Sequence, residues 1–184
     1  MRETTIGRAK LQLVVGDITA QDTEAVVNAA NERLAPGGGV AGAIHRAAGP
    51  DLWQECSLLG GCATGQAKIT RGYNLPNQYV IHTVGPVYSG SEKDPVLLRS
   101  CYVSCLQAAD ARGIRSVSFP ALSTGIFGYP VEEAARVAIR AFRDYLSGNT
   151  GIGLVRMVLY DRAAYDAHVR ALEEGEREGG PSAG

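Results

Sequence analysis

The sequence has almost no net charge and no long run of apolar residues. Eighteen Lys and Arg residues balance nineteen Asp and Glu residues, which leaves a formal net charge of −1 over 184 residues. Such a chain has no overall positive field to attract nucleic acid or an anionic membrane surface, so neither is expected as a partner. No window reaches the roughly eighteen apolar residues of a membrane-spanning helix, and the first ten residues lack an apolar core segment. We therefore expect a soluble, cytoplasmic protein.

Cysteine is scarce too, at four residues in the whole chain. Without an export signal, reducing conditions would keep these cysteines as thiols rather than as a disulfide framework. Cys101 and Cys105 are four residues apart on an expected helix with apolar neighbours, which favours buried small side chains over metal ligands. No histidine lies close in sequence to Cys56 and Cys62, as a zinc site would require. We predict neither a metal site nor a cofactor.

What the sequence does contain is a regular alternation of strand-like and helix-like segments. Its apolar content of 45% is sufficient for one sizeable core. Several strand candidates are apolar at both parities, as strands covered on both faces are, which predicts an α/β sandwich with a largely parallel sheet. We expect strands over residues 11–15, 25–29, 67–70, 79–84, 116–119 and 154–160, and helices over 40–48, 50–59, 95–112, 130–146 and 163–174.

Two segments are expected to lie outside this regular structure. Residues 87–94, with Ser-Gly-Ser in the middle, are typical of an exposed connection. Residues 175–184 have almost no apolar surface to bury, so they are expected to be disordered. The sequence therefore predicts one domain over residues 1–174, followed by a disordered tail.

The most distinctive segment joins a buried strand to a helix through glycine. Asn28 and Asn31 come first, three glycines follow at positions 37–39, and a helix is expected to begin at Val40. Glycines can adopt backbone angles closed to other residues, and their unhindered N–H groups can line up on phosphate oxygens. The helix start adds further unpaired N–H groups, and the two carboxamides offer donors and acceptors to sugar hydroxyls or to a water. The alternative is a glycine-rich turn without a ligand.

A second glycine loop follows another predicted strand. Residues 123–130 read Ser-Thr-Gly-Ile-Phe-Gly-Tyr-Pro and lead into a helix. Ligands of open α/β sheets bind beyond the carboxyl ends of the strands, so two such loops can grip two linked phosphates from opposite sides. Phe127 is unusual in an exposed turn unless a sugar or base covers it, although its ring can also fold back onto the domain. The two loops together indicate a diphosphate ligand.

Other nucleotide-binding motifs agree less well with this chain. Residues 37–42 satisfy the dinucleotide pattern G-x-G-x-x-G, but residues 32–36 separate the strand from its first glycine. Position 62, where that fold would carry an acidic residue, is Cys62. A phosphate-binding loop of the G-x-x-x-x-G-K-[ST] type is absent from the sequence.

Six short motifs occur in an order that resembles one known family. They are Asn28-Ala29-Ala30-Asn31, the loop from Gly37 to Gly42, Ile44-His45-Arg46-Ala47-Ala48-Gly49-Pro50, Cys62-Ala63-Thr64-Gly65-Gln66-Ala67, Ile81-His82-Thr83-Val84-Gly85-Pro86 and Ser123-Thr124-Gly125-Ile126-Phe127-Gly128. Together they look like a macrodomain of the MacroD-like branch, and the resemblance extends from about Leu11 to His168. It implies a three-layer α/β/α fold with a mixed, largely parallel sheet. It also implies binding of ADP-ribose or an ADP-ribosylated protein.

The resemblance also implies which residues bind each part of the ligand. At the adenine end it places Asp17, as acceptor for the adenine amino group, with the Ile18 backbone beside it, and Tyr160 flanking the ring. At the phosphates and the distal ribose it places Asn31, Gly38, Gly39, Val40, Ser123, Thr124, Gly125, Ile126 and Phe127. Both adenine-end residues also have a purely structural interpretation. Asp17 can cap the turn after the first strand, and Tyr160 can be a strand-end tyrosine with its hydroxyl in water.

One position departs from the family pattern. An aspartate usually precedes the histidine by four residues, whereas here Ala41 precedes His45. The two positions share a helix face, so the usual arrangement couples a carboxylate to the histidine or to a nearby water, and this chain lacks it. Viral macrodomains with a similar Gly-Gly-Gly-Val-Ala-Gly run are credited with hydrolysis. The resemblance therefore suggests a slow hydrolase of ADP-ribosyl esters or O-acetyl-ADP-ribose that uses Asn31 and His45, or alternatively a reader that binds ADP-ribose without turnover.

Overall fold

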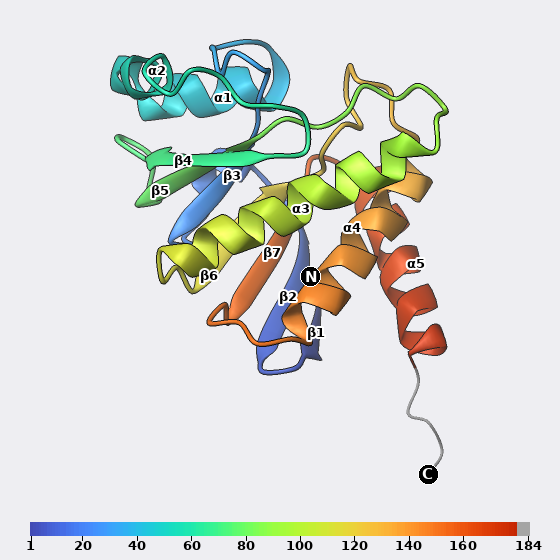
Figure 1. Cartoon of the computed structure of the whole chain (residues 1–184). Helices are drawn as coiled ribbons and strands as arrows, with labels where there is room; N and C mark the ends of the chain where they lie inside the picture. Colours follow the sequence, from blue (N-terminus) through green and yellow to red (C-terminus); the bar gives the residue numbers. More distant parts are fainter. Residues whose placement is uncertain (180–184) are drawn as a thin grey trace.

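The computed structural model describes residues 1–179 and is shown in Figure 1. Within those residues the chain forms five α-helices, one short 3-10 helix and one seven-stranded sheet. In chain order the elements are β1 (Arg2–Ile6), β2 (Ala9–Val15), η1 (Ile18–Ala20), β3 (Ala25–Ala29), α1 (Gly39–Ala48), α2 (Pro50–Cys56), β4 (Ala67–Arg71), β5 (Tyr79–Thr83), α3 (Lys93–Ala111), β6 (Ser116–Pro120), α4 (Val131–Leu146), β7 (Leu154–Leu159) and α5 (Arg162–Glu178).

The strand order across the sheet is β1-β2-β7-β6-β3-β5-β4. The five central strands are parallel to one another. Only the two edge strands of the described sheet are antiparallel to their neighbours, β1 to β2 and β4 to β5. The predicted mixed, largely parallel sheet is therefore confirmed. Because parallel strands end at the same edge of a sheet, the loops that follow β2, β3, β6 and β7 all emerge at one end of the molecule.

Helices cover both faces of the sheet, which gives the expected three layers (Figure 1). The helices α3, α4 and α5 pack on one face, and α1 and α2 pack on the other. Strand parity decides which core each residue enters. In β3, Val27 faces the three-helix side, whereas Val26 faces α1 and α2. Both are fully buried, as the continuous apolar pattern of this strand predicts.

The structure corrects two details of the predicted elements. Residues 2–6, which lack an apolar core segment, form the edge strand β1, because only Ile6 of that strand needs to be buried. Helix α2 ends at Cys56, three residues before its predicted end, and Leu58 and Leu59 form turn hydrogen bonds instead. Most other bounds agree within two residues. None of the helices in residues 1–179 is long and apolar enough to span a membrane.

The predicted disordered tail is wrong for its first part. Helix α5 continues to Glu178, so residues 175–178 are helical, whereas the expectation for residues 180–184 lies outside the described residues. Two exposed ion pairs lie along the extension: Arg2 reaches Glu176 at 3.6 Å, and Arg140 reaches Glu178 at 3.6 Å.

Candidate functional site

The first glycine loop leads directly into helix α1. Gly38 is the N-cap residue, and it has no side chain to satisfy the first N–H groups of the helix. Gly39 adopts a φ of +55°, in the left-handed region that favours glycine. A Cβ built on either Gly38 or Gly39 meets no described atom within 4 Å. Val40 is half-buried at the same helix start. The loop therefore presents unhindered backbone and a helix N-terminus to open space at the carboxyl edge of the sheet.

The rear of this loop is packed tightly against the helix. A Cβ built on Gly42 would overlap the carbonyl oxygen of Gly37 and lie 3.0 Å from the Arg46 guanidinium. Gly42 itself donates its N–H to the Gly38 carbonyl at 3.1 Å. The glycine at position 42 is therefore required for close approach, whereas those at 38 and 39 leave space for a ligand.

The Asn31 carboxamide forms two hydrogen bonds to the backbone of the segment that joins β3 to the glycines. Its Nδ2 donates to the Ala35 carbonyl at 2.9 Å, and its Oδ1 accepts from the Ala35 N–H at 3.0 Å. Leu34, inside this closed turn, has a φ of +58° and donates its N–H to the Asn31 carbonyl. Asn31 is half-buried, and Nδ2 lies 3.6 Å from a Cβ built on Gly37. It is thus at the base of the first glycine loop, and both polar atoms of its side chain already have protein partners.

Asn28 does not reach the same place, although the sequence presents the two carboxamides together. It lies within β3 on the same face as Val26, so it points under α1 and α2 and is buried. Its Nδ2 donates to His82 Nδ1 at 3.1 Å, and Oδ1 has no hydrogen-bond partner among the described residues. The expectation that Asn28 offers its amide to a sugar is not supported by this position.

His82 is held neutral beneath the first loop. Because Asn28 Nδ2 can only donate, His82 Nδ1 accepts and the ring proton lies on Nε2, 2.8 Å from Thr70 Oγ1 and 3.7 Å from Cys56 Sγ. Burial, with a smaller contribution from nearby His45, lowers the pKa of His82 to about 3. Burial likewise raises the pKa of the Cys56 thiol to about 11. This network is structural, and no short sequence pattern could reveal it because its members come from four elements.

Ala41 and His45 lie on the buried face of α1, one turn apart. His45 is 7% exposed, and neither ring nitrogen has a hydrogen-bond partner within residues 1–179. Burial lowers the pKa of His45, so its imidazole is neutral at physiological pH. Ala41 offers it a methyl group, which accepts no proton. The helix therefore carries a neutral imidazole that no neighbouring carboxylate on this face orients.

The second glycine loop is a compact turn that exposes its tip. Tyr129 N donates to the Ser123 carbonyl at 2.9 Å, and Gly128 N donates to the Gly125 carbonyl at 3.0 Å. Ser123 has a φ of +66° and is buried, and its Oγ has no partner among the described side chains and backbone. Thr124 and Phe127 are half-buried, so the Phe127 ring is neither fully solvated nor part of the core. Ile126, at the tip, is 99% exposed.

The connection between β5 and α3 is attached to this second loop. Tyr88 N donates to the Phe127 carbonyl at 2.9 Å, and the Tyr88 ring lies 5.0 Å from the Tyr129 ring. Gly85 is packed against Ser123. The expectation of an exposed connection is confirmed for residues 87–93, and the structure adds that this connection is hydrogen-bonded to the second loop. Sequence reasoning missed this contact because it joins residues about 40 positions apart and depends on one backbone hydrogen bond.

The residues predicted for the adenine end follow β2 and β7. Asp17 caps η1: its Oδ1 accepts from Thr19 N at 2.9 Å and from Thr19 Oγ1 at 2.7 Å. These hydrogen bonds lower the pKa of the Asp17 carboxyl, which keeps it ionised. Ile18 is buried beside it. Tyr160 follows β7 and is 92% exposed, so its ring is free to stack or to remain in water. The capping interpretation of Asp17 is confirmed, and its adenine role stays a prediction.

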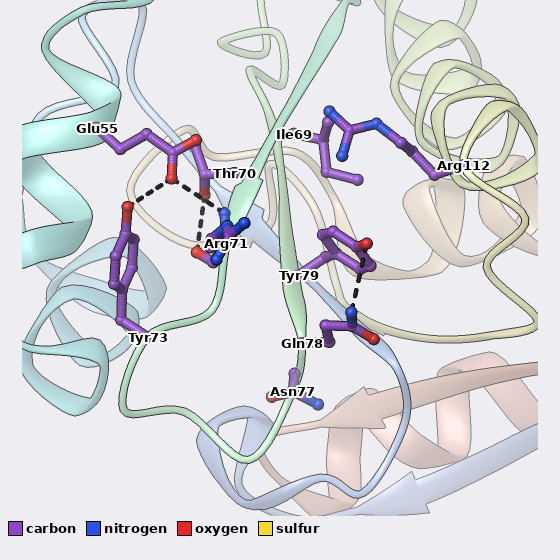
Figure 2. Close-up of a pocket in the computed structure, with 9 residues that line it drawn as sticks. All are labelled: Glu55, Ile69, Thr70, Arg71, Tyr73, Asn77, Gln78, Tyr79 and Arg112. Carbon is purple, nitrogen blue, oxygen red and sulfur yellow. Dashed lines mark hydrogen bonds between the residues drawn. The ribbon is translucent and has the colours of Figure 1, made fainter.

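A cavity lies elsewhere, at the β4 edge of the sheet (Figure 2). It has a volume of about 560 Å³, and its lining includes Glu55, Arg71, Tyr73, Tyr79 and Arg112. No predicted site residue lines it. The cavity is next to the start of β5 and the end of antiparallel β4, so it is opposite the edge where the glycine loops emerge.

No group of three His, Cys, Asp or Glu side chains in residues 1–179 is arranged to hold a metal ion. Cys101 and Cys105 are buried on α3 with their thiols free, as expected of small packing residues. The Cys101 Sγ donates to the Val84 carbonyl at 3.2 Å.

Comparison with known proteins gives a consistent result. The family model described as Macro domain matches residues 27–138. O-acetyl-ADP-ribose deacetylase 1 of Pantoea vagans is 46% identical over 168 residues, which cover 89% of this chain and 98% of that protein. The solved Oceanobacillus iheyensis macrodomain with ADP has a TM-score of 0.93 and 38% identity, with 96% of this chain and 97% of that chain covered. The Trypanosoma brucei macrodomain in complex with ADP-ribose has a TM-score of 0.83 and 40% identity, with 88% of this chain and 68% of that chain covered. These matches agree with the six sequence motifs, the sheet order and the two glycine loops, and this chain belongs to the macro domain family.

Proposed function

We propose that this macrodomain binds ADP-ribose, with the diphosphate between the two glycine loops, Asn31 at the distal ribose, and Asp17 and Tyr160 at the adenine. The observation that carries the proposal is the open backbone at Gly38 and Gly39, where neither glycine has a described atom near its Cβ position. Such backbone, at a helix N-terminus, suits an anion better than any other ligand. The names of relatives support this choice, since one solved structure holds ADP and another holds ADP-ribose.

We further propose that the bound compound is hydrolysed when it carries an ester at the distal ribose, on an acidic side chain or as O-acetyl-ADP-ribose. The name of the Pantoea vagans relative supports this reaction class. In the glycosyl ester a water oxygen forms a bond to the anomeric carbon, and a phosphate oxygen of the substrate takes its proton. The bond between that carbon and the leaving carboxylate breaks, and the carboxylate keeps the electron pair. The protein contributes by holding the phosphates and the ribose in line for the attack.

The rate should be low because the general base is incomplete. General acid–base catalysis contributes ~100-fold to 10,000-fold when a group of matched pKa is positioned on the reacting proton. His45 is neutral and has the chemistry of a base, but it is buried and Ala41 cannot orient it. We assign His45 to assistance of the water from beneath the first loop. The phosphate of the substrate supplies the rest.

A reader without turnover is the second candidate, and two observations favour it. Ala41 lacks the carboxylate that the related pattern carries, and the Asn31 amide is already bonded in both directions to Ala35. To hold the ribose, Asn31 must share its hydrogen bonds with the ligand or give one up. Binding would survive either outcome, because the phosphate contacts come from backbone.

Calorimetric titration with ADP-ribose, followed by a release assay on the same sample with a peptide that carries ADP-ribose on glutamate, separates these functions. Binding together with release above a buffer control supports the hydrolase. Binding without release supports the reader, and absence of binding rejects both. The control variant is Gly125→Val, because a Cβ at Gly125 meets no described atom within 4 Å. It should fold normally and bind ADP-ribose at least about tenfold more weakly, since the new side chain occupies the phosphate position.

A further inference from the structure

Three exposed side chains form an apolar rim beside the second glycine loop. Val87 is 62% exposed, Tyr88 is 37% exposed and Ile126 is 99% exposed. A single exposed apolar residue is ordinary on a protein surface, whereas several brought together from separate segments mark a contact surface. The hydrogen bond from Tyr88 N to the Phe127 carbonyl places the two segments that carry these residues side by side.

The rim is held in place by the protein itself. Within the connection between β5 and α3, the buried Asp94 carboxylate accepts from Ser89 N at 2.9 Å and from Gly90 N at 2.8 Å. These backbone hydrogen bonds lower the pKa of Asp94, so its carboxylate stays ionised and keeps both hydrogen bonds at neutral pH. The Tyr88 ring packs on Tyr129, which is buried. A surface already ordered in the free protein loses little conformational entropy when a partner binds.

We propose that the rim docks the polypeptide that carries the ADP-ribosyl group and recognises an apolar side chain next to the modified carboxylate. The inference rests on the proposed function, which puts the diphosphate at the second glycine loop, and on the family resemblance, which implies that Phe127 of that loop lies against the distal ribose. The polypeptide is attached to that ribose, so it must leave the cleft beside Phe127, where the rim lies. None of Val87, Tyr88 and Ile126 carries a charge, and the Asp94 carboxylate is occupied by backbone, so the surface offers hydrophobic contact to the polypeptide.

The test uses binding rather than turnover, so that it works for a hydrolase or a reader. Two peptides carry ADP-ribose through an amide that resists hydrolysis, and they differ only in whether valine or serine flanks the modified residue. Wild-type protein should bind the valine peptide about fivefold more tightly, which corresponds to partial burial of one aliphatic side chain. Val87→Ser should bind free ADP-ribose as wild type does and lose most of this preference. Ile126→Ser should also reduce the ratio between the two peptides.

Leu58→Ser is the matched control. Leu58 is 84% exposed, but it lies after α2 beside the edge strand β4, where Lys68 Nζ donates to the Leu59 carbonyl. This variant should keep the full preference for the valine peptide. Equal binding of the two peptides by wild type overturns the inference, as does an undiminished preference in both rim variants. Failure to bind free ADP-ribose instead rejects the proposed function, so the two failures are distinguishable.

Discussion

Replacing Gly85 with alanine tests how closely the β5–α3 connection packs on the second glycine loop. Gly85 is buried, and its φ lies outside the left-handed region, so its backbone accepts alanine. A Cβ at this position would nevertheless overlap Ser123 Oγ, although Ser123 Cβ is 3.5 Å away. Adding a methyl group to a packed site costs about 1–3 kcal/mol, and we expect Gly85→Ala to lower the free energy of unfolding by this amount. The Ser123 hydroxyl, which belongs to the second loop, must also turn away, and this should weaken ADP-ribose binding by up to about tenfold.

The overlap involves one oxygen atom, so a second substitution should relieve it. Ser123 Oγ has no hydrogen-bond partner in residues 1–179, and Ser123→Ala therefore removes no described bond. In the double variant the two Cβ atoms meet at an ordinary contact distance, and a coupling free energy of about 1–2 kcal/mol is expected. Urea unfolding measures stability and calorimetry measures binding. Gly153→Ala, whose nearest neighbour is 3.9 Å away, should change stability by less than about 0.5 kcal/mol. The reasoning is refuted if Gly85→Ala matches wild type, or if Ser123→Ala does not rescue it.

Three further predictions concern α1 and the histidines. Ala41→Asp places a carboxylate one turn from the unpartnered His45 ring and should raise the rate of ester release about 100-fold; an unchanged rate in a folded variant would exclude His45 from proton transfer. Stability should fall by ~2 kcal/mol between pH 7.5 and pH 5 from His82 alone, because the unfolded histidine gains a proton that the folded one, with a pKa of about 3, does not bind. Urea midpoints that stay flat over this range would contradict it. Gly42→Ala should destabilise by about 1–3 kcal/mol through overlap with the Gly37 carbonyl, and thermal melts beside Ala43→Ser, on the same helix, would reveal any generic effect of substitution in α1.

The central strands were predictable because their own residues decide their burial. β3 matches the predicted bounds at residues 25–29, since the segment is apolar at both parities and needs two covered faces. β1 was not predictable on that basis, because it buries Ile6 and little else, and it becomes a strand by pairing with β2. The last turns of α5 likewise carry little apolar pattern, and they contact β1 and α4 through exposed ion pairs. The local apolar pattern thus predicts the elements whose own residues form the core. It misses the elements at the periphery, which bury few apolar residues.

In the candidate site, the position of the backbone was easier to predict than the direction of the side chains. Glycine runs at the carboxyl ends of strands predicted both loops, because a parallel sheet must bring those ends together. Side-chain direction was harder. Strand parity places Asn28 in phase with Val26, which was a sufficient signal to assign it to the core, but its partner His82 is 54 positions away. Asn31 lies beyond the strand, where parity no longer applies, and its bonds to Ala35 follow from the local turn.

Binding and turnover depend on different parts of this scaffold. The phosphates are proposed to meet backbone N–H groups, which no side-chain substitution removes, so affinity for ADP-ribose should be indifferent to residue 41. The proposed assistance of the water by His45 comes instead from the buried face of α1, where Ala41 and His45 lie one turn apart. A change from aspartate to alanine there leaves the helix start, the Asn31 turn and both loops unaffected. The proposed binding contacts are therefore independent of residue 41, and in our proposal the slow hydrolase differs from a reader in how far the His45 imidazole adds to the activation of water by the substrate phosphate.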